Sequence, residues 1–316
     1  MSSINTNTAA MTALQALMQT NKMLTQVQGH ISTGLRVAEA SDNAAYWSIA
    51  TTMKSDKASL STVQDALGLG ASMVDVTYTA MNSAIDVVDQ IKSKLVAARE
   101  PGVDKTKIQT EITQLQKQLK GIADSASFSG QDWLSIDSSA AGFSSTRTVV
   151  SSFNRTGSTV SIQTIDIDTS GMDLFDANPA TTNAAAGILD GNRTAAGVID
   201  NTATTWSISN LNISALTDSA TDVTTLNSYI SGADAAIKEM TDAASSLGAT
   251  KSRISLQQDF VKSLMDALDR GVGTLVDADM NQESTRLQAL QIQQQLGVQA
   301  LSIANSSTQG ILKLFQ

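Results

Sequence analysis

Residues 285–316 read TRLQALQIQQQLGVQALSIANSSTQGILKLFQ, and they combine helical spacing with almost no charge. Between Leu287 and Leu312 the chain contains no aspartate, glutamate, lysine, arginine or histidine. Apolar residues recur mostly three or four positions apart, which predicts an α-helix. A solvated surface helix usually carries charged pairs at that spacing, and this segment has none. We therefore expect both faces of this helix to be covered by protein.

Residues 1–35 form a counterpart at the other end of the chain. Lys22 is their only formally charged side chain, and their apolar residues again follow helical spacing. Ordinary termini are polar and frayed, so two uncharged amphipathic ends are expected to pack on each other and on neighbouring copies. The alternative is a terminal coiled coil within one monomer. The expected subunit–subunit assembly residues are Met11, Leu14, Met18, Leu24, Val27, Ile31, Leu35, Leu287, Leu290, Leu296, Val298, Leu301, Ile311 and Phe315.

The composition excludes several classes of function. The chain has 41% hydrophobic but only 4% aromatic residues, so its apolar mass is mainly aliphatic and suits long, closely packed helices. A net charge of -9 argues against nucleic acid and membrane surfaces as partners, because both require a basic patch. There is no cysteine for disulfides or thiolate chemistry. The N-terminal residues lack a signal-peptide pattern, and no apolar run approaches the roughly 20 residues of a membrane span.

Three long helices are expected between the two ends. The first follows a turn in which Ser41 or Asp42 is the candidate N-cap. Asp104 is the candidate N-cap of a second helix, which runs antiparallel to the first. Helical spacing returns at residues 226–268, and the glycines at 269–273 are expected to break this third helix.

A β-rich region is expected in the middle of the chain. Residues 146–168 alternate in polarity around a turn sequence at 154–157, which predicts a β-hairpin. Residues 170–215 are less regular and suggest a small insert. Gly68 and Gly70 lie inside the first long helix, where we expect them to permit close approach of a neighbouring element. A phosphate-binding role is disfavoured because no Lys-Ser/Thr pair follows them.

The expected fold is mainly α: a long antiparallel helical coiled-coil rod formed by the N- and C-terminal segments, with a central β-hairpin region and a small insert. We divide it into three parts. Residues 1–40 with 275–316 are the inner terminal coiled-coil domain, residues 41–169 with 216–274 are the helical rod domain carrying the hairpin, and residues 170–215 are the small outer insert.

No constellation of catalytic or metal-ligating residues emerges from the sequence. His30, the only histidine, lies among apolar positions, which favours a packing or interface role. A sequence like a calcium loop begins at Asp166, but Ala177 stands where the loop requires a bidentate glutamate. Asp277 and Asp279 are expected to cap a helix. The sequence therefore indicates a protein that is not an enzyme and that uses neither a cofactor nor a metal.

Several motifs resemble those of bacterial flagellins in their order and spacing. They are Ile31-Ser-Thr-Gly-Leu-Arg36, Ser41-Asp-Asn-Ala-Ala45 with Ile49-Ala50, Phe128-Ser-Gly130, Leu247-Gly-Ala249 with Arg253, Val276-Asp-Ala-Asp279 with Glu283, Ala300-Leu-Ser-Ile-Ala-Asn305 and Ile311-Leu-Lys-Leu-Phe315. The resemblance covers both ends of the chain. The character of these ends is similar to that of the alphaproteobacterial, rhizobium-type members.

The resemblance implies a secreted structural protein that self-assembles into the flagellar filament used for swimming motility. In flagellins the termini pair as an inner coiled coil, the long helices surround it, and the central insert faces outward. The implied partners are further copies of the chain and sister flagellins, a chaperone that serves flagellar type III export, the filament cap and the hook-junction proteins. An interface that does not close on itself generates an open filament of this kind.

Two alternatives to a filament subunit remain at this point. A hook–filament junction protein of the same family shares the ends and the rod, but it is made in few copies and does not polymerise alone. A secreted binding or adhesion protein requires an outer domain with a binding site. The short, polar insert offers no such site.

Residues 88–96 resemble the region that the host Toll-like receptor for flagellin reads. Gln90 and Lys94 stand where recognised members carry arginine and leucine, whereas Glu111 matches them. The resemblance therefore predicts weak recognition by this receptor.

Overall fold

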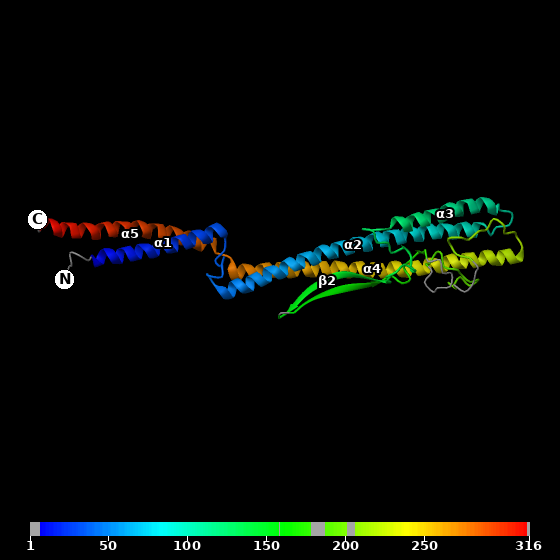
Figure 1. The fold of residues 1–316 in the computed structure, drawn as a ribbon. Helices are drawn as coiled ribbons and strands as arrows, with labels where there is room; N and C mark the ends of the chain where they lie inside the picture. Colours follow the sequence, from blue (N-terminus) through cyan, green and yellow to red (C-terminus); the bar gives the residue numbers. More distant parts are fainter. Residues whose placement is uncertain (1–6, 158, 178–186, 201–205, 315–316) are drawn as a thin grey trace. The chain divides into compact units, whose positions relative to one another are not determined.

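The computed structural model describes residues 7–157, 159–177, 187–200 and 206–314, and only the backbone of 307–314. The chain forms two compact units, which we call the terminal unit (Met1–Ala58 with Leu264–Gln316) and the central unit (Ser59–Ser263). Helices dominate both units, and Figure 1 shows them as long ribbons that lie in pairs. The expectation of a mainly α fold with a small central β region is confirmed.

The terminal unit is built on α1 (Thr8–Thr33) and α5 (Met280–Leu314), which lie side by side (Figure 1). Asn7 is the N-cap of α1, and its side chain accepts a hydrogen bond from the backbone amide of Ala10. The helix ends at Gly34, whose φ of 72° lies in the left-handed region that favours glycine. Asp279 accepts hydrogen bonds from two backbone amides at the start of α5, so its expected capping role is confirmed.

The turn between α1 and α2 (Ala44–Ala97) corrects one expectation. Asn43, rather than Ser41 or Asp42, caps α2, because its side chain accepts hydrogen bonds from the backbone amides of residues 45 and 46. Asp42 instead stabilises the preceding turn by accepting the amides of residues 38 and 39. The side-chain oxygen of Asn43 reaches the free amides of the first helical turn, which is what a cap requires.

The expected break at residues 269–273 is wrong, because α4 (Ala220–Val276) continues through this segment. A Cβ atom added at Gly271 would come within 2.8 Å of the Met53 side chain, so this glycine lets α2 and α4 approach each other. A glycine inside a helix costs only about 1 kcal/mol, which helix packing offsets. The terminal part of α4 also carries Val272 and Val276, which form a small core with Val37 and Ala50.

In the central unit, α2 and α4 run antiparallel. Lys92 pairs with Asp234 at 2.5 Å and Lys251 pairs with Asp75 at 2.6 Å, so ascending positions on one helix meet descending positions on the other. The helix α3 (Lys105–Ser125) begins at its confirmed N-cap, Asp104. The core between the helices consists of fully buried residues that include Leu67, Val74, Met81, Ile91, Leu95, Ile112, Leu119, Leu247 and Ile254.

The expected hairpin is confirmed as β2 (Thr146–Thr156) paired antiparallel with β3 (Thr159–Asp168). It packs against the long helices: Val149 fills the space above Gly70, where an added Cβ would lie only 2.4 Å from the valine Cγ1. Gln257 of α4 donates a hydrogen bond to the Ser151 carbonyl. Gly70 therefore permits the expected close approach, but the expectation is wrong for Gly68, which faces open space.

The described part of the insert packs on α4 of the central unit. Within it, the short strand β4 (Phe175–Asp176) pairs in parallel with β1 (Ser135–Ile136), which precedes the hairpin in the sequence. Trp206 packs edge-on against Tyr229 of α4 and covers Gly232. The fully buried Arg193 side chain reaches Glu239 of the same helix at 2.7 Å. This region is therefore fixed by aromatic packing and by one ion pair whose arginine is fully buried.

Candidate subunit interface

The helices α1 and α5 form an antiparallel pair whose register is set by side-chain hydrogen bonds. Near the ends of the chain, the Asn7 amide donates to the Ala304 carbonyl at 2.9 Å. Further along, the Gln294 amide donates to the Asn21 side chain at 2.8 Å. These pairs join residues that are almost as far apart in the sequence as the chain allows. The two ends of the chain therefore build one element.

Buried and half-buried residues along this pair form a seam with alternating steps of three and four, the heptad spacing of a coiled coil. We call the following residues the seam: Ala10, Ala13, Leu17, Thr20, Leu24, Val27 and Ile31 of α1, and Glu283, Leu287, Leu290, Gln294, Gly297, Leu301 and Ala304 of α5. Half of them are alanine, glycine or polar residues. The contact within one chain therefore leaves much of the large apolar surface of these helices uncovered.

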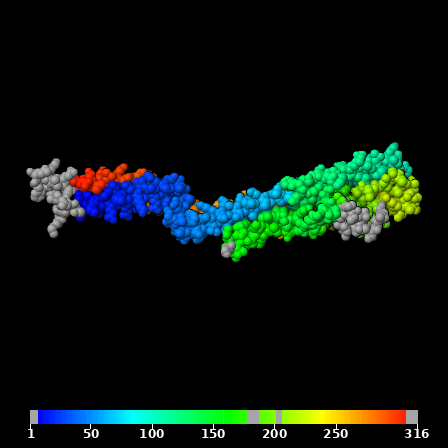
Figure 2. Space-filling view, viewed as in Figure 1, coloured from blue at the N-terminus to red at the C-terminus, as the bar shows by residue number. Residues whose placement is uncertain are grey.

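That uncovered surface is carried by seven large side chains with exposed fractions between 47% and 68%. We call them the outward set: Met11, Leu14 and Met18 of α1, and Ile292, Leu296, Val298 and Ile303 of α5. Figure 2 shows that no other described segment covers the visible face of α1, drawn in blue. Exposed apolar side chains gathered on one element are typical of interaction sites.

The outward set lies on more than one face of the helix pair. The spacing of Met11, Leu14 and Met18 places them on one face of α1, beside the seam. Ile292 and Leu296 share a face of α5 that points away from the seam. A surface that is apolar in two directions has the geometry for contacts with more than one neighbour.

A hollow of about 450 Å³ follows the apolar face of α1. Its lining combines the three apolar residues of the outward set on this helix with short polar side chains. The lining residues are Thr8, Met11, Thr12, Leu14, Gln15 and Met18. A hollow with apolar walls and uncharged polar edges has the chemistry to accept a side chain from another helix.

The structure sorts the fourteen expected assembly residues into different environments. Leu24, Val27, Ile31, Leu287, Leu290 and Leu301 lie in the seam, whereas Met11, Leu14, Met18, Leu296 and Val298 belong to the outward set. Leu35 lies at the turn, where it bridges to Asp277. Phe315 and the side chain of Ile311 lie outside the described residues. Ile292 and Ile303 were not expected as site residues, although their helical spacing with Leu296 was a usable signal.

A buried polar pair lies where α1 meets the start of α5. The Nδ1 atom of His30 is 3.2 Å from Oε1 of Glu283, and both side chains are almost fully buried. Among the described residues, the remaining atoms Nε2 of His30 and Oε2 of Glu283 have no hydrogen-bond partner. This geometry agrees with a packing role for the histidine, because the pair fixes the position of one helix on the other.

The turn that follows α1 is held by the carboxylate of Asp42. The backbone N–H groups of Glu39 and Ala38 donate to this carboxylate and lower the pKa of Asp42. In the same turn, the backbone N–H groups of Arg36 and Val37 donate hydrogen bonds to the Val276 carbonyl at the end of α4. The entry into α2 is thus tied to the exit from α4 by main-chain hydrogen bonds.

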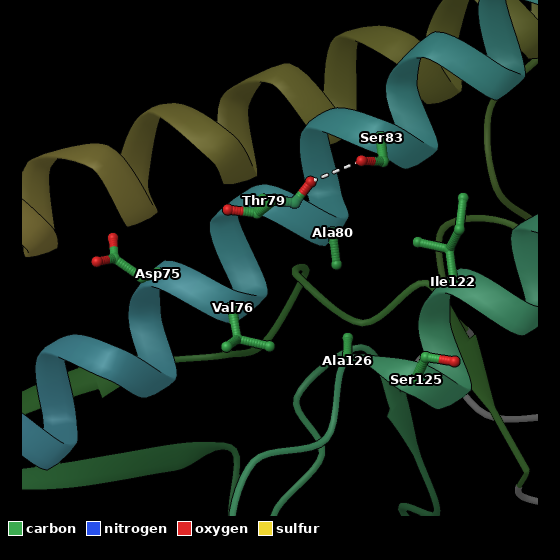
Figure 3. Close-up of a pocket in the computed structure, with 8 residues that line it drawn as sticks. All are labelled: Asp75, Val76, Thr79, Ala80, Ser83, Ile122, Ser125 and Ala126. Carbon is green, nitrogen blue, oxygen red and sulfur yellow. Dashed lines mark hydrogen bonds between the residues drawn. The ribbon is translucent and has the colours of Figure 1, made fainter.

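The central unit has a second hollow, of about 450 Å³, between α2 and α3 (Figure 3). Figure 3 shows Val76, Ala80 and Ile122 beside the hydroxyl groups of Thr79, Ser83 and Ser125, and its lining also includes Asp75 and Ala126. The Ser83 hydroxyl is hydrogen-bonded to the Thr79 carbonyl of its own helix. The Asp75 carboxylate, the one ionisable group among these lining residues, forms an ion pair with Lys251 of α4 at 2.6 Å.

Neither a metal centre nor a membrane span is found in the described part of the chain. Over residues 7–157, 159–177, 187–200 and 206–314, no group of three acidic or histidine side chains has the arrangement to hold a metal ion. Within the same residues, no helix combines the length and apolarity that crossing a membrane requires.

The residues of the receptor-like region lie on the surface of the central unit. Gln90 is exposed on α2. Lys94, on the same helix, forms an ion pair of 2.5 Å with Glu111 of α3, and both side chains are about half exposed. All three of these side chains are therefore accessible, and two of them contact each other.

Comparison with known proteins gives matches over both ends and over the full length. A family model described as the bacterial flagellin N-terminal helical region matches residues 4–138, and one described as the bacterial flagellin C-terminal helical region matches residues 230–315. Flagellin C of Rhizobium meliloti (strain 1021) is 51% identical and Flagellin A of Rhizobium meliloti is 43% identical. A flagellin of Brucella melitensis biotype 1 is 44% identical. Each alignment covers 100% of both chains.

Proposed function

The chain belongs to the bacterial flagellin family, and on that premise we propose that its outward set is the surface through which copies assemble into the flagellar filament. The protein is a structural subunit of that filament, and its family is structural rather than enzymatic. The observation that supports the assembly surface is the exposure of seven large apolar side chains on the uncharged terminal helices.

Burial of these side chains contributes favourably to assembly. Full burial of one large aliphatic side chain stabilises by about 1.5–3 kcal/mol. Half of that value for each member of the outward set gives on the order of 5–10 kcal/mol per subunit, before the cost of association. Because the set faces two directions, each copy contacts different neighbours through different faces. Such heterologous contacts generate an open filament when they do not close into a ring.

The assembly proposal is tested with polar substitutions in the outward set. The double variant Leu14→Gln/Leu296→Gln removes one exposed apolar side chain from each helix and leaves the seam intact. We expect its circular dichroism to match that of the unmodified monomer, while its elongation of filament seeds, followed by electron microscopy, is lost. The control is Val198→Gln, which changes an equally exposed side chain of the insert and should leave elongation normal. Normal elongation by the double variant would overturn the proposal.

The seeding experiment also separates the filament subunit from the hook–filament junction protein. A filament subunit grows from a seed into long filaments, whereas a junction protein does not polymerise alone. Removal of residues 287–316 should leave a soluble, largely helical monomer that cannot elongate a seed. Retention of normal polymerisation after this truncation would contradict a role for the C-terminal helix in assembly.

We further propose how the subunit reaches the filament and what it meets there. It is exported by the flagellar type III apparatus with a chaperone on its C-terminal segment, and it assembles in the extracellular filament beneath a cap and beyond the hook-junction proteins. Rhizobium meliloti has proteins named Flagellin A, B, C and D, which supports mixed filaments with sister flagellins. Secretion assays in a strain that lacks the export apparatus test the route, because the chain should then stay inside the cell.

The three-part division of the chain also stands as a proposal: 1–40 with 275–316, 41–169 with 216–274, and 170–215. In the filament, the first part lies innermost and the insert outermost. Surface labelling of intact filaments tests this order. Labels should react with cysteines introduced in the insert and should not reach cysteines introduced in the terminal helices.

We propose weak recognition by the host Toll-like receptor for flagellin. The support is the residue types at positions 90 and 94, together with the ion pair that engages Lys94 with Glu111. In a receptor reporter assay, the purified monomer should signal only at high concentration. Gln90→Arg/Lys94→Leu should signal more strongly, and strong signalling by the unmodified chain would contradict the proposal.

A further inference from the structure

Two methionine sulfurs lie within the outward set. The chain contains 11 methionines and no cysteine, so methionine is its only sulfur-containing residue. Among the described residues, three methionines are exposed: Met11 at 61%, Met18 at 65% and Met280 at 43%. The first two flank Leu14 on one face of α1 and line the hollow on that face. Exposed thioethers are thus concentrated on the proposed assembly surface.

We propose that Met11 and Met18 are oxidation sites, and that their conversion to sulfoxides prevents the free subunit from joining a filament. This inference rests on the proposed function of the outward set. With hydrogen peroxide as the oxidant, a sulfur lone pair attacks one peroxide oxygen, the O–O bond breaks, and the S–O bond of the sulfoxide forms. After proton transfer the other oxygen leaves as water. Sulfur loses two electrons and the peroxide gains them.

The change in polarity is what links oxidation to assembly. A thioether is a flexible apolar group that fills irregular gaps in an interface. Its sulfoxide carries a strong hydrogen-bond acceptor, which is hydrated on the free subunit. Burial of that acceptor without a donor is unfavourable. The hollow around these residues offers the side-chain groups of Thr8, Thr12 and Gln15 at its edge, but its walls are apolar.

Exposure makes the modification selective for these sites and for the unassembled state. Met81 and Met240 are fully buried in the central unit, so peroxide has no access to their sulfurs in the folded chain. Met11 and Met18 become covered by neighbouring copies once the filament forms. Oxidation therefore acts on subunits before they are incorporated, and a completed filament is protected.

Met280 provides a matched control within the chain. It is exposed like the other two, but it is the first residue of α5 and does not belong to the outward set. Its oxidation should proceed in the free subunit without affecting elongation. The variants M11L/M18L and M280L keep a nearly equivalent apolar volume and remove the oxidisable sulfur at the two kinds of position.

The test exposes the purified, full-length monomer and, separately, preformed filaments to dilute hydrogen peroxide. Peptide mass spectrometry then measures oxidation at each methionine. In the monomer, Met11 and Met18 should oxidise about tenfold faster than Met81 and Met240, because reaction follows exposure. In filaments, Met11 and Met18 should oxidise as slowly as Met81 and Met240, because neighbouring copies cover them. Equal oxidation of all four positions in the monomer would overturn the assignment of the sites.

Seeded elongation gives the functional readout. The oxidised monomer should elongate roughly tenfold more slowly, since one unsatisfied polar group in an interface has about that effect. Methionine sulfoxide reductases should restore the rate. M11L/M18L should elongate normally and resist peroxide, whereas M280L should remain sensitive. The double variant M11L/M18L could elongate slowly even before oxidation. In that case the single variants M11L and M18L are used, and the elongation rate of each is compared before and after peroxide treatment.

The outcomes separate this inference from the proposed function. Peroxide sensitivity that is unchanged in M11L/M18L, and in both single variants, would overturn the oxidation switch and leave the assembly surface standing. Normal elongation by the polar variant Leu14→Gln/Leu296→Gln would overturn the assembly surface itself. The second result does not depend on any oxidised residue.

Discussion

Nδ1 of His30 lies 3.2 Å from Oε1 of Glu283, so a residue near the start of the chain and one near its end form a buried polar pair. This contact fixes α1 against α5 at the end of the pair closest to α2 and α4. Most of the seam beyond it consists of small or aliphatic side chains. The pair therefore contributes to the register of the two helices, together with the Asn7–Ala304 and Asn21–Gln294 hydrogen bonds.

Glu283→Ala should lower the free energy of unfolding by about 1–3 kcal/mol, because it leaves the buried imidazole without its partner. Glu283→Gln keeps a polar side chain of the same shape at this position. It should therefore lower the free energy of unfolding by less than Glu283→Ala does. Urea unfolding followed by circular dichroism measures the change, and hydrogen exchange in α1 shows whether it is local. If alanine and glutamine are both neutral, the contact contributes nothing to stability.

Gly68 and Gly70 form a matched pair for testing helix–hairpin packing. An added Cβ at position 70 meets the Val149 side chain at 2.4 Å, whereas one at position 68 meets nothing within 4 Å. Gly70→Ala should therefore destabilise by about 1–3 kcal/mol through overpacking. Gly68→Ala should stabilise by about 0.5–1 kcal/mol, because alanine is the better helix former. The urea midpoint measures both changes.

Val149→Ala provides the control for the steric argument. It removes the methyl groups that an alanine at position 70 would meet. In the Gly70→Ala background, this second substitution should therefore cost less than it does alone. Strictly additive effects of the two substitutions would show that the hairpin does not pack on this glycine.

Asp173 makes the stability of the central unit depend on pH. Burial, and to a smaller degree the carboxylates of Asp176 and Asp190, raise the pKa of Asp173 from 3.8 to about 6. The folded chain therefore binds this proton more tightly than the unfolded chain. The stability that the protonated group contributes is fully present below pH 3.8 and is lost as the pH rises to about 6.

Asp173→Asn should accordingly raise the free energy of unfolding at pH 7 by up to about 3 kcal/mol, because it removes the buried charge and keeps an acceptor for the Gly171 amide. The gain should vanish near pH 4. Asp168→Asn is the control of opposite sign, since hydrogen bonds from Ser170 lower the pKa of Asp168. Thermal unfolding at the two pH values measures the difference. A gain for Asp173→Asn that is equal at both pH values would contradict the titration of this group.

The Arg193 side chain holds the insert on α4, so removal of this side chain should release the insert from the helix. The fully buried guanidinium donates to the carbonyls of Gly197 and Ile188 and to Glu239, each at 2.7 Å. Arg193→Ala should lower the free energy of unfolding by about 2–6 kcal/mol, because the carbonyl groups of Gly197 and Ile188 lose their donor. Protease cleavage within the insert, measured by mass spectrometry, should become faster.

The exposed ion pair between Lys92 and Asp234 provides the comparison for Arg193→Ala. The Asp234 side chain is 68% exposed, so Asp234→Ala should change stability by less than about 1 kcal/mol. An equally large effect of Asp234→Ala and Arg193→Ala on proteolysis would show that burial does not determine the strength of these contacts.

Local signals in the sequence were sufficient for much of the fold. The cap at Asp104 and the hairpin at residues 146–168 both depend on neighbouring residues, and the structure contains both. The expectation of a break at 269–273 was wrong because it used glycine propensity alone. A Cβ atom at position 271 would meet the Met53 side chain, and Met53 is too distant in the sequence for a local argument to include it.

By itself, the sequence determined that the two ends are uncharged amphipathic helices, because periodicity and charge are properties of a single segment. Which apolar side chains pack inside the chain depends on how the two helices pair. Leu24 and Val27 lie in the seam, while Met11 and Met18 face outward. Helical spacing gives the relative directions of side chains around one axis, but it does not say which direction faces the partner. The pairing of α1 with α5 supplies that direction, through contacts such as Asn21 with Gln294.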